Sequence, residues 1–241
     1  MAIYDDFLGT ELDRTKWNSY TDAGCTQTVH DGVLTLSNSA TEATVNSVYT
    51  KKTDWSIGKY RARVIPKSGD SPTSVQLSLF KGDMPLPDEM AMIKITGTDG
   101  TIKCNTRRGG SWDTGTTLGV ATFGQPYELE IEVTSDRIIF RAFDADGNLI
   151  GTETRTTLPN FGFPSPTFTV DLRNGLGSAG GSQDGDFDWI DCPEEYFAEE
   201  VEEVEEKAPV LIAGIPVVTW TIIGVVVVII AVAFYFALRR R

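Results

Sequence analysis

"YELEIEVTSDRIIFRAFDADG", residues 127–147, is the stretch that decides the fold. In its first seven residues apolar and acidic side chains alternate, with Tyr127, Leu129, Ile131 and Val133 on one side and Glu128, Glu130 and Glu132 on the other. Strict alternation predicts a half-buried strand, and "TSD" before the next alternating run predicts a turn between two paired strands. We therefore expect a hairpin whose apolar face lies in the core and whose three glutamates point to water.

The same period of two recurs along residues 1–193. "DGVLTLSNS", "KYRARVIP", "SVQLSLF" and "TFTVDL" all have it, and no long helical pattern precedes residue 194. Many short strands at near-regular spacing, separated by turns rich in Gly, Asp and Asn, are typical of a sandwich or jelly roll. The sequence predicts one all-β domain over residues 1–193, a jelly-roll sandwich of two antiparallel sheets.

Beyond this domain the composition changes twice. Residues 194–208 are strongly acidic and read as a solvated linker or stalk, whereas residues 209–238 contain no charged side chain. The apolar run is long enough to cross a bilayer as a helix at about 1.5 Å per residue, and aromatic residues lie near both of its ends. Three arginines, at 239–241, form a basic tail. The sequence predicts a single-pass membrane protein with its N-terminal domain outside and its C-terminus in the cytoplasm.

The N-terminus does not show how the chain would reach a membrane. "MAIYDDFLGTELD" has neither a basic segment nor an apolar stretch, so no secretory signal is visible. Two alternatives stay open: a leader has been removed, or the chain inserts by its tail. A tail-inserted protein would keep its domain in the cytoplasm or carry it on the membrane of a virion.

Charge and cysteine content exclude several classes of function. The net charge of −13 argues against a nucleic-acid partner. Three cysteines, Cys25, Cys104 and Cys192, are far apart, and His30 is the single histidine, so a structural zinc site is not expected. We expect three buried thiols, with one disulfide and a leftover thiol as the alternative.

The order of these segments resembles that of a known family. "YDDFLGTELDRTKW" at residues 4–17, "IGKYRARV" at 57–64, the hairpin at 127–147 and "FDWIDC" at 187–192 resemble, in the same order, segments of laminarinase-type glycoside hydrolases, family sixteen, and their non-catalytic relatives. The resemblance covers roughly residues 3–192. It implies a concanavalin A-like fold, two stacked and curved antiparallel sheets, with a concave face that holds sugars in many relatives.

The resemblance also shows a degraded catalytic motif. Family catalysts carry Glu-x-Asp-x-Glu, or a variant with one extra residue, on one strand, and retaining hydrolysis needs two carboxyls about 5 Å apart. In "PDEMAMIKITG" the matching positions are Glu89, Ala91 and Ile93, or Lys94 in the longer variant. A single glutamate cannot both attack the sugar and protonate the leaving oxygen. We expect no enzyme activity.

Alternation places a row of polar residues in the expected groove: Gln76, Ser78, Asn105, Arg107, Asp171 and Arg173. Trp112 is the best candidate for stacking on a sugar ring. Asn174 is followed by Gly175, where the family usually places a tryptophan soon afterwards. Together with Glu89 and Asn174, these residues are our predicted glycan-binding set. The alternative is that they coat a solvated sheet face, where Arg107 and Asp171 pair across the groove.

Two further sets follow from the resemblance. Trp17, Trp55 and Trp189 match structural positions, so we expect them in the core. Relatives often hold a structural calcium ion where the first and last strands meet, and Asp5, Asp6, Asp186 and Asp188 are acidic residues near that point. A structural Ca²⁺ is therefore an expectation, although no cofactor is required.

These observations favour a membrane-anchored, non-catalytic recognition or adhesion protein whose jelly-roll head binds a glycan or a protein. The bilayer would be contacted through residues 209–238. The alternative is a structural protein of a surface layer or of a membrane-containing virion, with homo-oligomer or lattice neighbours packed against its head.

Overall fold

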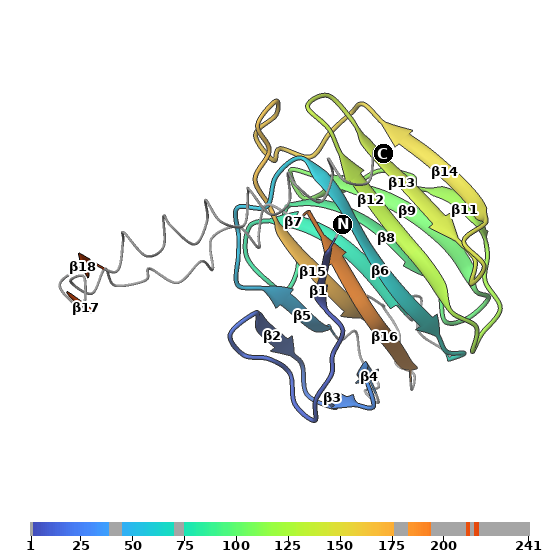
Figure 1. The fold of residues 1–241 in the computed structure, drawn as a ribbon. Helices are drawn as coiled ribbons and strands as arrows, with labels where there is room; N and C mark the ends of the chain where they lie inside the picture. The colour runs from blue at the N-terminus through green and yellow to red at the C-terminus, as the bar shows by residue number, and fades with distance from the viewer. Residues whose placement is uncertain are drawn as a thin grey trace, which may run out of the picture. The chain divides into compact units, whose positions relative to one another are not determined.

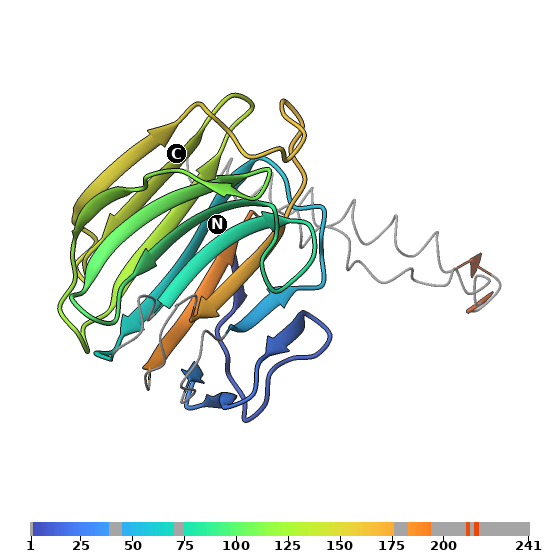
Figure 2. The ribbon, with the colours of Figure 1, turned by 180° about the vertical axis from the view of Figure 1, so that it is seen from behind.

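A computed structural model of the chain describes residues 2–38, 45–69, 75–175 and 183–193, together with 211–212 and 215–216. By their internal contacts, the residues divide into two compact units, Met1–Tyr196 and Phe197–Arg241, each of which is described by itself. The first unit consists of two eight-stranded sheets, which Figures 1 and 2 show stacked as two layers. The predicted all-β sandwich is confirmed.

One layer, sheet A, contains the hairpin on which the fold prediction rests. Its strands pair antiparallel in the order β14 (Leu149–Arg155), β13 (Ile138–Phe143), β12 (Tyr127–Val133), β6 (Gly58–Pro66), β16 (Gln183–Cys192), β4 (Val33–Asn38) and β3 (Cys25–His30), with β1 (Ala2–Asp5) also on β16. The last strand of this unit, β16, therefore lies between strands from the first third of the chain. This arrangement closes the sandwich with long-range contacts.

The other layer, sheet B, carries the strand that resembles the catalytic strand of the hydrolases. Its order is β10 (Ser111–Trp112), β9 (Thr101–Arg108), β8 (Glu89–Ile95), β7 (Val75–Lys81), β15 (Thr169–Asn174), β5 (Asn46–Thr50) and β2 (Trp17–Thr21), and β11 (Thr116–Val120) also pairs with β9. Strand β8 is interior, flanked by β7 and β9. A side chain on its outer face therefore has neighbours on both sides.

The core lies between the two sheets and is apolar. Leu129, Ile131 and Val133 of β12 are buried, as the alternation predicts, and they belong to one cluster with Leu77 and Ile93 of sheet B. Burying one such side chain is worth about 1.5–3 kcal/mol relative to leaving it exposed. The apolar side chains of residues 127–133 are therefore buried, as their alternation predicts.

Aromatic rings fill one end of this core. Tyr4 meets the rings of Trp17 and Trp55 edge to face, with centroids 5.4 and 5.6 Å apart. Trp17 also donates through its indole nitrogen to the carboxylate of Asp5 at 2.6 Å. The prediction that Trp17 and Trp55 belong to the core is confirmed, since they are 0% and 2% exposed.

Trp189 does not follow that prediction. A β-bulge interrupts the pairing of β16 with β6 between Phe187 and Trp189. The extra residue shifts the alternation, so that Phe187 and Ile190 point into the core while Trp189 is only partly buried. Trp189 was therefore wrongly predicted to be a core residue, and the bulge is the reason.

The outer face of sheet A contains a second departure from expectation. Glu130 was expected in water, but its side chain is 1% exposed. Arg61 of β6 donates to it at 2.5 Å and Arg141 of β13 donates to it at 2.5 Å. Burial raises the pKa of Glu130, but its hydrogen bonds and ion pairs with the two arginines outweigh burial and hold the pKa below its ordinary value. The two long arginine side chains cover the carboxylate from both neighbouring strands.

The three cysteines remain thiols, and two of them are buried as expected. Cys104 and Cys192 are buried and Cys25 is partly buried, and none forms a disulfide. Burial raises the pKa of the Cys104 thiol to about 11, and burial also raises the pKa of Cys192 well above its ordinary value. Both buried thiols are therefore protonated at neutral pH.

The predicted membrane segment lies mostly outside the described residues, as does the acidic linker at 194–208. Where the segment is described, strands β17 (Leu211–Ile212) and β18 (Ile215–Pro216) pair as a short hairpin, so a helix is not present at these four positions. Pro216 has no amide hydrogen and restricts Ile215 to extended conformations, which disfavours a helix there. Among the residues that the structure describes, no helix is long and apolar enough to span a bilayer.

Candidate functional site

The outer face of strand β8 is where relatives with catalytic motifs would present their carboxylates. Ala91 and Ile93 are fully buried in the core between the sheets, whereas Met90 and Met92 form a separate cluster with Phe80 of β7. Alternation puts Lys94 on the same outer face as these methionines. The prediction that Glu89, Ala91 and Ile93 share the groove is therefore wrong: the register is shifted by one residue, and the outward positions hold two thioethers and an amine.

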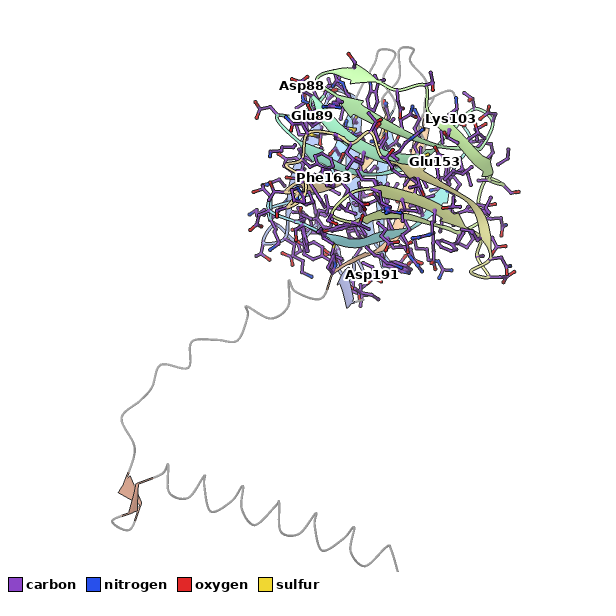
Figure 3. All side chains as sticks on the ribbon, turned by 90° about the horizontal axis from the view of Figure 1, so that it is seen from above. Asp88, Glu89, Lys103, Glu153, Phe163 and Asp191 are labelled. Carbon is purple, nitrogen blue, oxygen red and sulfur yellow. The ribbon has the colours of Figure 1, made fainter. Side chains whose placement is uncertain are left out.

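Glu89 has a different role at the start of β8. Its carboxylate accepts hydrogen bonds from the backbone nitrogen of Gly109 at 2.8 Å and from that of Asn160 at 2.6 Å. Two loops that are far apart in sequence are thereby joined at one end of sheet B. Figure 3 shows Asp88 and Glu89 on the side of the molecule formed by this sheet, opposite Asp191 of sheet A. Glu89 is thus engaged by backbone donors of its own chain.

The polar row expected to line a groove is buried instead. Gln76, Ser78, Asp171 and Arg173 are all 0% exposed. The carboxylate of Asp171 accepts from Ser78 at 2.8 Å and from Arg173 at 2.9 Å, and Ser47 of β5 also donates to it. A buried charge is stable only when it is paired and hydrogen-bonded, and this network satisfies that requirement. Neither the open groove nor the solvated face that we expected is found at these four residues.

Residues 82–88, the loop between β7 and β8, lie over this part of the face. Arg173 donates to the carbonyl oxygen of Pro85 at 3.0 Å. Arg107 donates to the carbonyl oxygens of Leu86 and Pro87 at 2.9 and 2.7 Å. Two guanidinium groups therefore hold the loop by its backbone. The expected pair between Arg107 and Asp171 does not form, because each has closer partners.

Of the remaining glycan-binding candidates, Trp112 is the one whose side chain is accessible to a ligand. Its side chain is 40% exposed, and the guanidinium carbon of Arg107 lies 5.5 Å from the centre of its ring. Asn105 donates to the carboxylate of Asp113 at 3.1 Å. Asn174 is fully buried and donates to the carbonyl oxygen of Leu36 at 2.6 Å, so it joins the two sheets. Only Trp112 of this group presents a large surface to a ligand.

Two lysines that were not among the predicted glycan-binding residues lie on the outer face. Lys94 of β8 pairs in register with Lys103 of β9, and both side chains are partly buried. Burial lowers the pKa of Lys94, and the positive charge of Lys103 lowers it further. The alternation in "MIKI" and "TIKC" could have revealed the pair, but only once the register of the two strands was known.

A polar pocket of about 350 Å³ lies between β9 of sheet B and the end of β14 of sheet A. Its lining residues are Thr106, Asp113, Thr154, Arg155, Thr156 and Thr157. Asp113 accepts from Thr106 at 2.9 Å, and Arg155 lies 3.5 Å from it. Because the carboxylate, guanidinium and hydroxyl groups already contact one another, the lining of the pocket is held together by its own polar contacts.

The four aspartates expected to hold calcium are separately engaged. The carboxylate of Asp5 accepts hydrogen bonds from the amide of Phe7 at 2.9 Å and from the indole nitrogen of Trp17. The carboxylate of Asp6 accepts a hydrogen bond from the amide of Leu8 at 3.4 Å. Asp186 pairs with a lysine at 2.8 Å and Asp188 with an arginine at 3.3 Å. Among the described residues no three metal-ligating side chains are grouped closely enough to hold an ion. Calcium binding stays a prediction from the resemblance.

Comparison with known proteins supports the architecture. No family model and no curated protein matches the sequence. A Bacillus licheniformis beta-glucanase is 15% identical with a TM-score of 0.51, and the match covers 77% of this chain and 94% of that one. SCLam, a non-specific endo-beta-1,3(4)-glucanase from family GH16, is 15% identical with a TM-score of 0.53, covering 79% and 92%.

A third structure contains a bound sugar. The exoplasmic/lumenal domain of VIP36, in its Ca²⁺/Man3GlcNAc-bound form, is 11% identical with a TM-score of 0.52, covering 73% of this chain and 82% of that one. At these identities the likeness concerns the fold alone. The two-sheet topology and these matches together show that the chain has the concanavalin A-like jelly-roll fold of the family-sixteen glucanases.

Proposed function

We propose that this chain is a non-catalytic recognition protein that binds a glycan on the outer face of sheet B. The observation that carries the proposal is the outer face of β8, where Met90, Met92 and Lys94 occupy the outward positions. Retaining hydrolysis requires two carboxyls about 5 Å apart on either side of the scissile bond. Thioethers and an amine cannot supply the nucleophile and the proton donor that this reaction needs.

Glycan is the proposed ligand class for two reasons. The VIP36 domain with the same fold was solved with Man3GlcNAc bound. On this chain Trp112 offers an exposed ring next to the Arg107 guanidinium, and an aromatic face beside a polar donor suits the apolar face and hydroxyls of a sugar. Because loop 82–88 covers the centre of the face, the proposed binding surface is the side formed by β9 and β10, with Trp112 and the partly buried Lys94 of β8.

The test is a glycan array with the full chain in mild detergent, alongside a reducing-sugar assay on the glycans that bind. We expect binding without release of sugar. Trp112→Ala should weaken binding at least tenfold, and Trp189→Ala, on the other sheet, is the matched control. Turnover of any bound glycan would overturn the non-catalytic assignment. Absence of glycan binding, together with recovery of the native protein in a regular lattice or particle, would favour the structural role.

Membrane anchoring is the second part of the proposal. It is supported by the uncharged stretch at 209–238 and by the three arginines that follow it. We expect the full chain to resist alkaline carbonate extraction, whereas a chain ending at residue 208 should be released. Protease protection of residues 1–193 in sealed vesicles distinguishes the two orientations. Release of the full chain by carbonate would refute the anchor.

A further inference from the structure

Charged side chains in register on neighbouring strands carry opposite charges in most pairs of the two sheets taken together, including Lys81 and Glu89 of sheet B. On sheet A, opposite charges face each other across neighbouring strands: Glu130 is in register with Arg61, and Glu132 with Lys59. On sheet B, Lys94 of β8 is in register with Lys103 of β9, so two positive charges face each other. The contrast is notable in a chain with 34 acidic and 21 basic residues.

This lysine pair has a cost. Directly opposite residues of an antiparallel pair have Cβ atoms about 4.5–5.5 Å apart, and like charges at that spacing destabilise the sheet. The two side chains are also partly buried, which weakens the screening of their repulsion by solvent. The lowered pKa of Lys94 has both causes, burial first and then the charge of Lys103. An anion placed between the two ammonium groups would remove the repulsion.

The surroundings of the pair indicate how large a ligand would be. The register puts Gln76 of β7 beside Lys94, and Thr117 of β11 beside Lys103, on the same row of the sheet. Along β9, Arg107 comes four positions after Lys103, and it is opposite Trp112. At about 3.3 Å per residue, that is roughly 13 Å. A ligand that reaches both the lysines and the tryptophan is therefore longer than a single sugar ring.

We propose that Lys94 and Lys103 form an anion-binding subsite, and that the ligand is an acidic saccharide chain carrying sulfate or carboxylate groups. The inference rests on the proposed glycan-binding function and names its ligand class. One acidic group would lie between the two ammonium groups and accept charge-assisted hydrogen bonds from both. A sugar further along the chain would stack on Trp112.

The test measures binding of the full chain in mild detergent to three polymers: dextran sulfate, polygalacturonate and neutral dextran. We expect binding to the acidic polymers that weakens as salt is raised, and weak or no binding to neutral dextran. Lys94→Gln and Lys103→Gln should each reduce affinity roughly tenfold, as expected for the loss of one charge-assisted hydrogen bond. Lys59→Gln, on sheet A, is the control and should leave affinity unchanged.

Thermal unfolding separates loss of a binding group from misfolding. Because each glutamine variant removes the like-charge repulsion, we expect an unchanged or raised Tm together with the loss of binding. The charge-retaining variant Lys94→Arg should keep most of the affinity for dextran sulfate. Reduced affinity that is accompanied by a lowered Tm in both glutamine variants would overturn the assignment.

The outcomes distinguish this inference from the function on which it rests. Binding of neutral glycans, unaffected by both lysine variants but lost in Trp112→Ala, would refute the acidic ligand and leave glycan recognition standing. Absence of binding to any glycan, neutral or acidic, would refute both the acidic ligand and glycan recognition itself. Lysine-dependent binding to phosphatidylserine vesicles, with none to dextran sulfate, would replace the saccharide with a lipid headgroup and overturn the proposal.

Discussion

Replacing Glu130 by glutamine should be the most destabilising single change on the outer face of sheet A. The Glu130 side chain is 1% exposed, and its carboxylate is shared between Arg61 and Arg141. Glu130→Gln keeps the shape of the side chain but removes the charge, so two guanidinium groups lose the anion that lies between them. The perturbation therefore tests the ion network separately from packing.

The magnitude follows from the burial of the three groups. Removing one partner of a fully buried ion pair costs about 3–5 kcal/mol, because the other charge is left uncompensated. Here Arg61 and Arg141 are 27% and 24% exposed, and each keeps a second carboxylate, Glu128 or Glu132. Water and the second partner offset part of the loss. We expect the free energy of unfolding to fall by about 2–3 kcal/mol.

Urea unfolding followed by tryptophan fluorescence measures this change. With a slope of about 2 kcal/mol per molar urea, the midpoint should fall by roughly 1–1.5 M. Glu128→Gln is the matched control: this side chain lies on the same strand, is 21% exposed and pairs with Arg61 alone, so its loss should cost less than about 1 kcal/mol. Equal destabilisation by the two variants would refute the argument from burial.

The pH dependence provides an independent check. Although burial opposes it, the pairing with both arginines holds the pKa of Glu130 in the folded state below its ordinary value of 4.5. A depressed pKa contributes stability above the unfolded-state value, and that contribution is lost as pH falls through the folded-state value. The stability difference between the wild type and Glu130→Gln should therefore be constant at neutral pH and shrink below about pH 4.5. A difference that grows on acidification would contradict the assigned sign.

Three further predictions concern other buried groups. Asp171→Asn leaves the Arg173 guanidinium buried without its anion. We expect urea unfolding to show a free energy of unfolding that is lower by about 3 kcal/mol, and a change below about 1 kcal/mol would contradict the ion pair. A thiol reagent at pH 8 should modify Cys25 first and Cys104 only on unfolding, because Cys104 is buried and its burial raises the pKa of the thiol to about 11. Rapid labelling of two or more thiols in the native state would contradict this order. Addition of a chelator tests the structural calcium ion that the resemblance predicts at Asp5, Asp6, Asp186 and Asp188: a bound ion gives a lower Tm in the chelator, and an unchanged Tm would contradict it.

The sequence predicted the fold because the relevant signal is local. Alternation over residues 127–133 depends on neighbouring residues alone, and it correctly assigned Tyr127, Leu129, Ile131 and Val133 to the core. The order of such segments was enough to indicate a jelly roll. Local alternation, however, does not state which of two sides is the core when both contain apolar residues. In β8 the choice lay between Ala91 with Ile93 and Met90 with Met92, and the sequence-based choice was wrong.

The site could not be derived in the same way, because burial on an outer face is decided by other parts of the chain. Gln76, Asp171 and Arg173 alternate like groove residues, yet Arg173 is bound by a loop that follows the neighbouring strand β7. Glu130 alternates like a solvated residue, yet arginines from two other strands cover it.

By itself, the sequence determined the all-β class and the segments that become strands, because these depend on residue type and on a period of two. Only the tertiary structure decided which side of β8 faces the core between the sheets, which polar residues are buried, and that Lys94 faces Lys103. The physical reason is that strand register and loop placement are set by contacts between distant residues, and a shift of one residue exchanges the two faces of a strand.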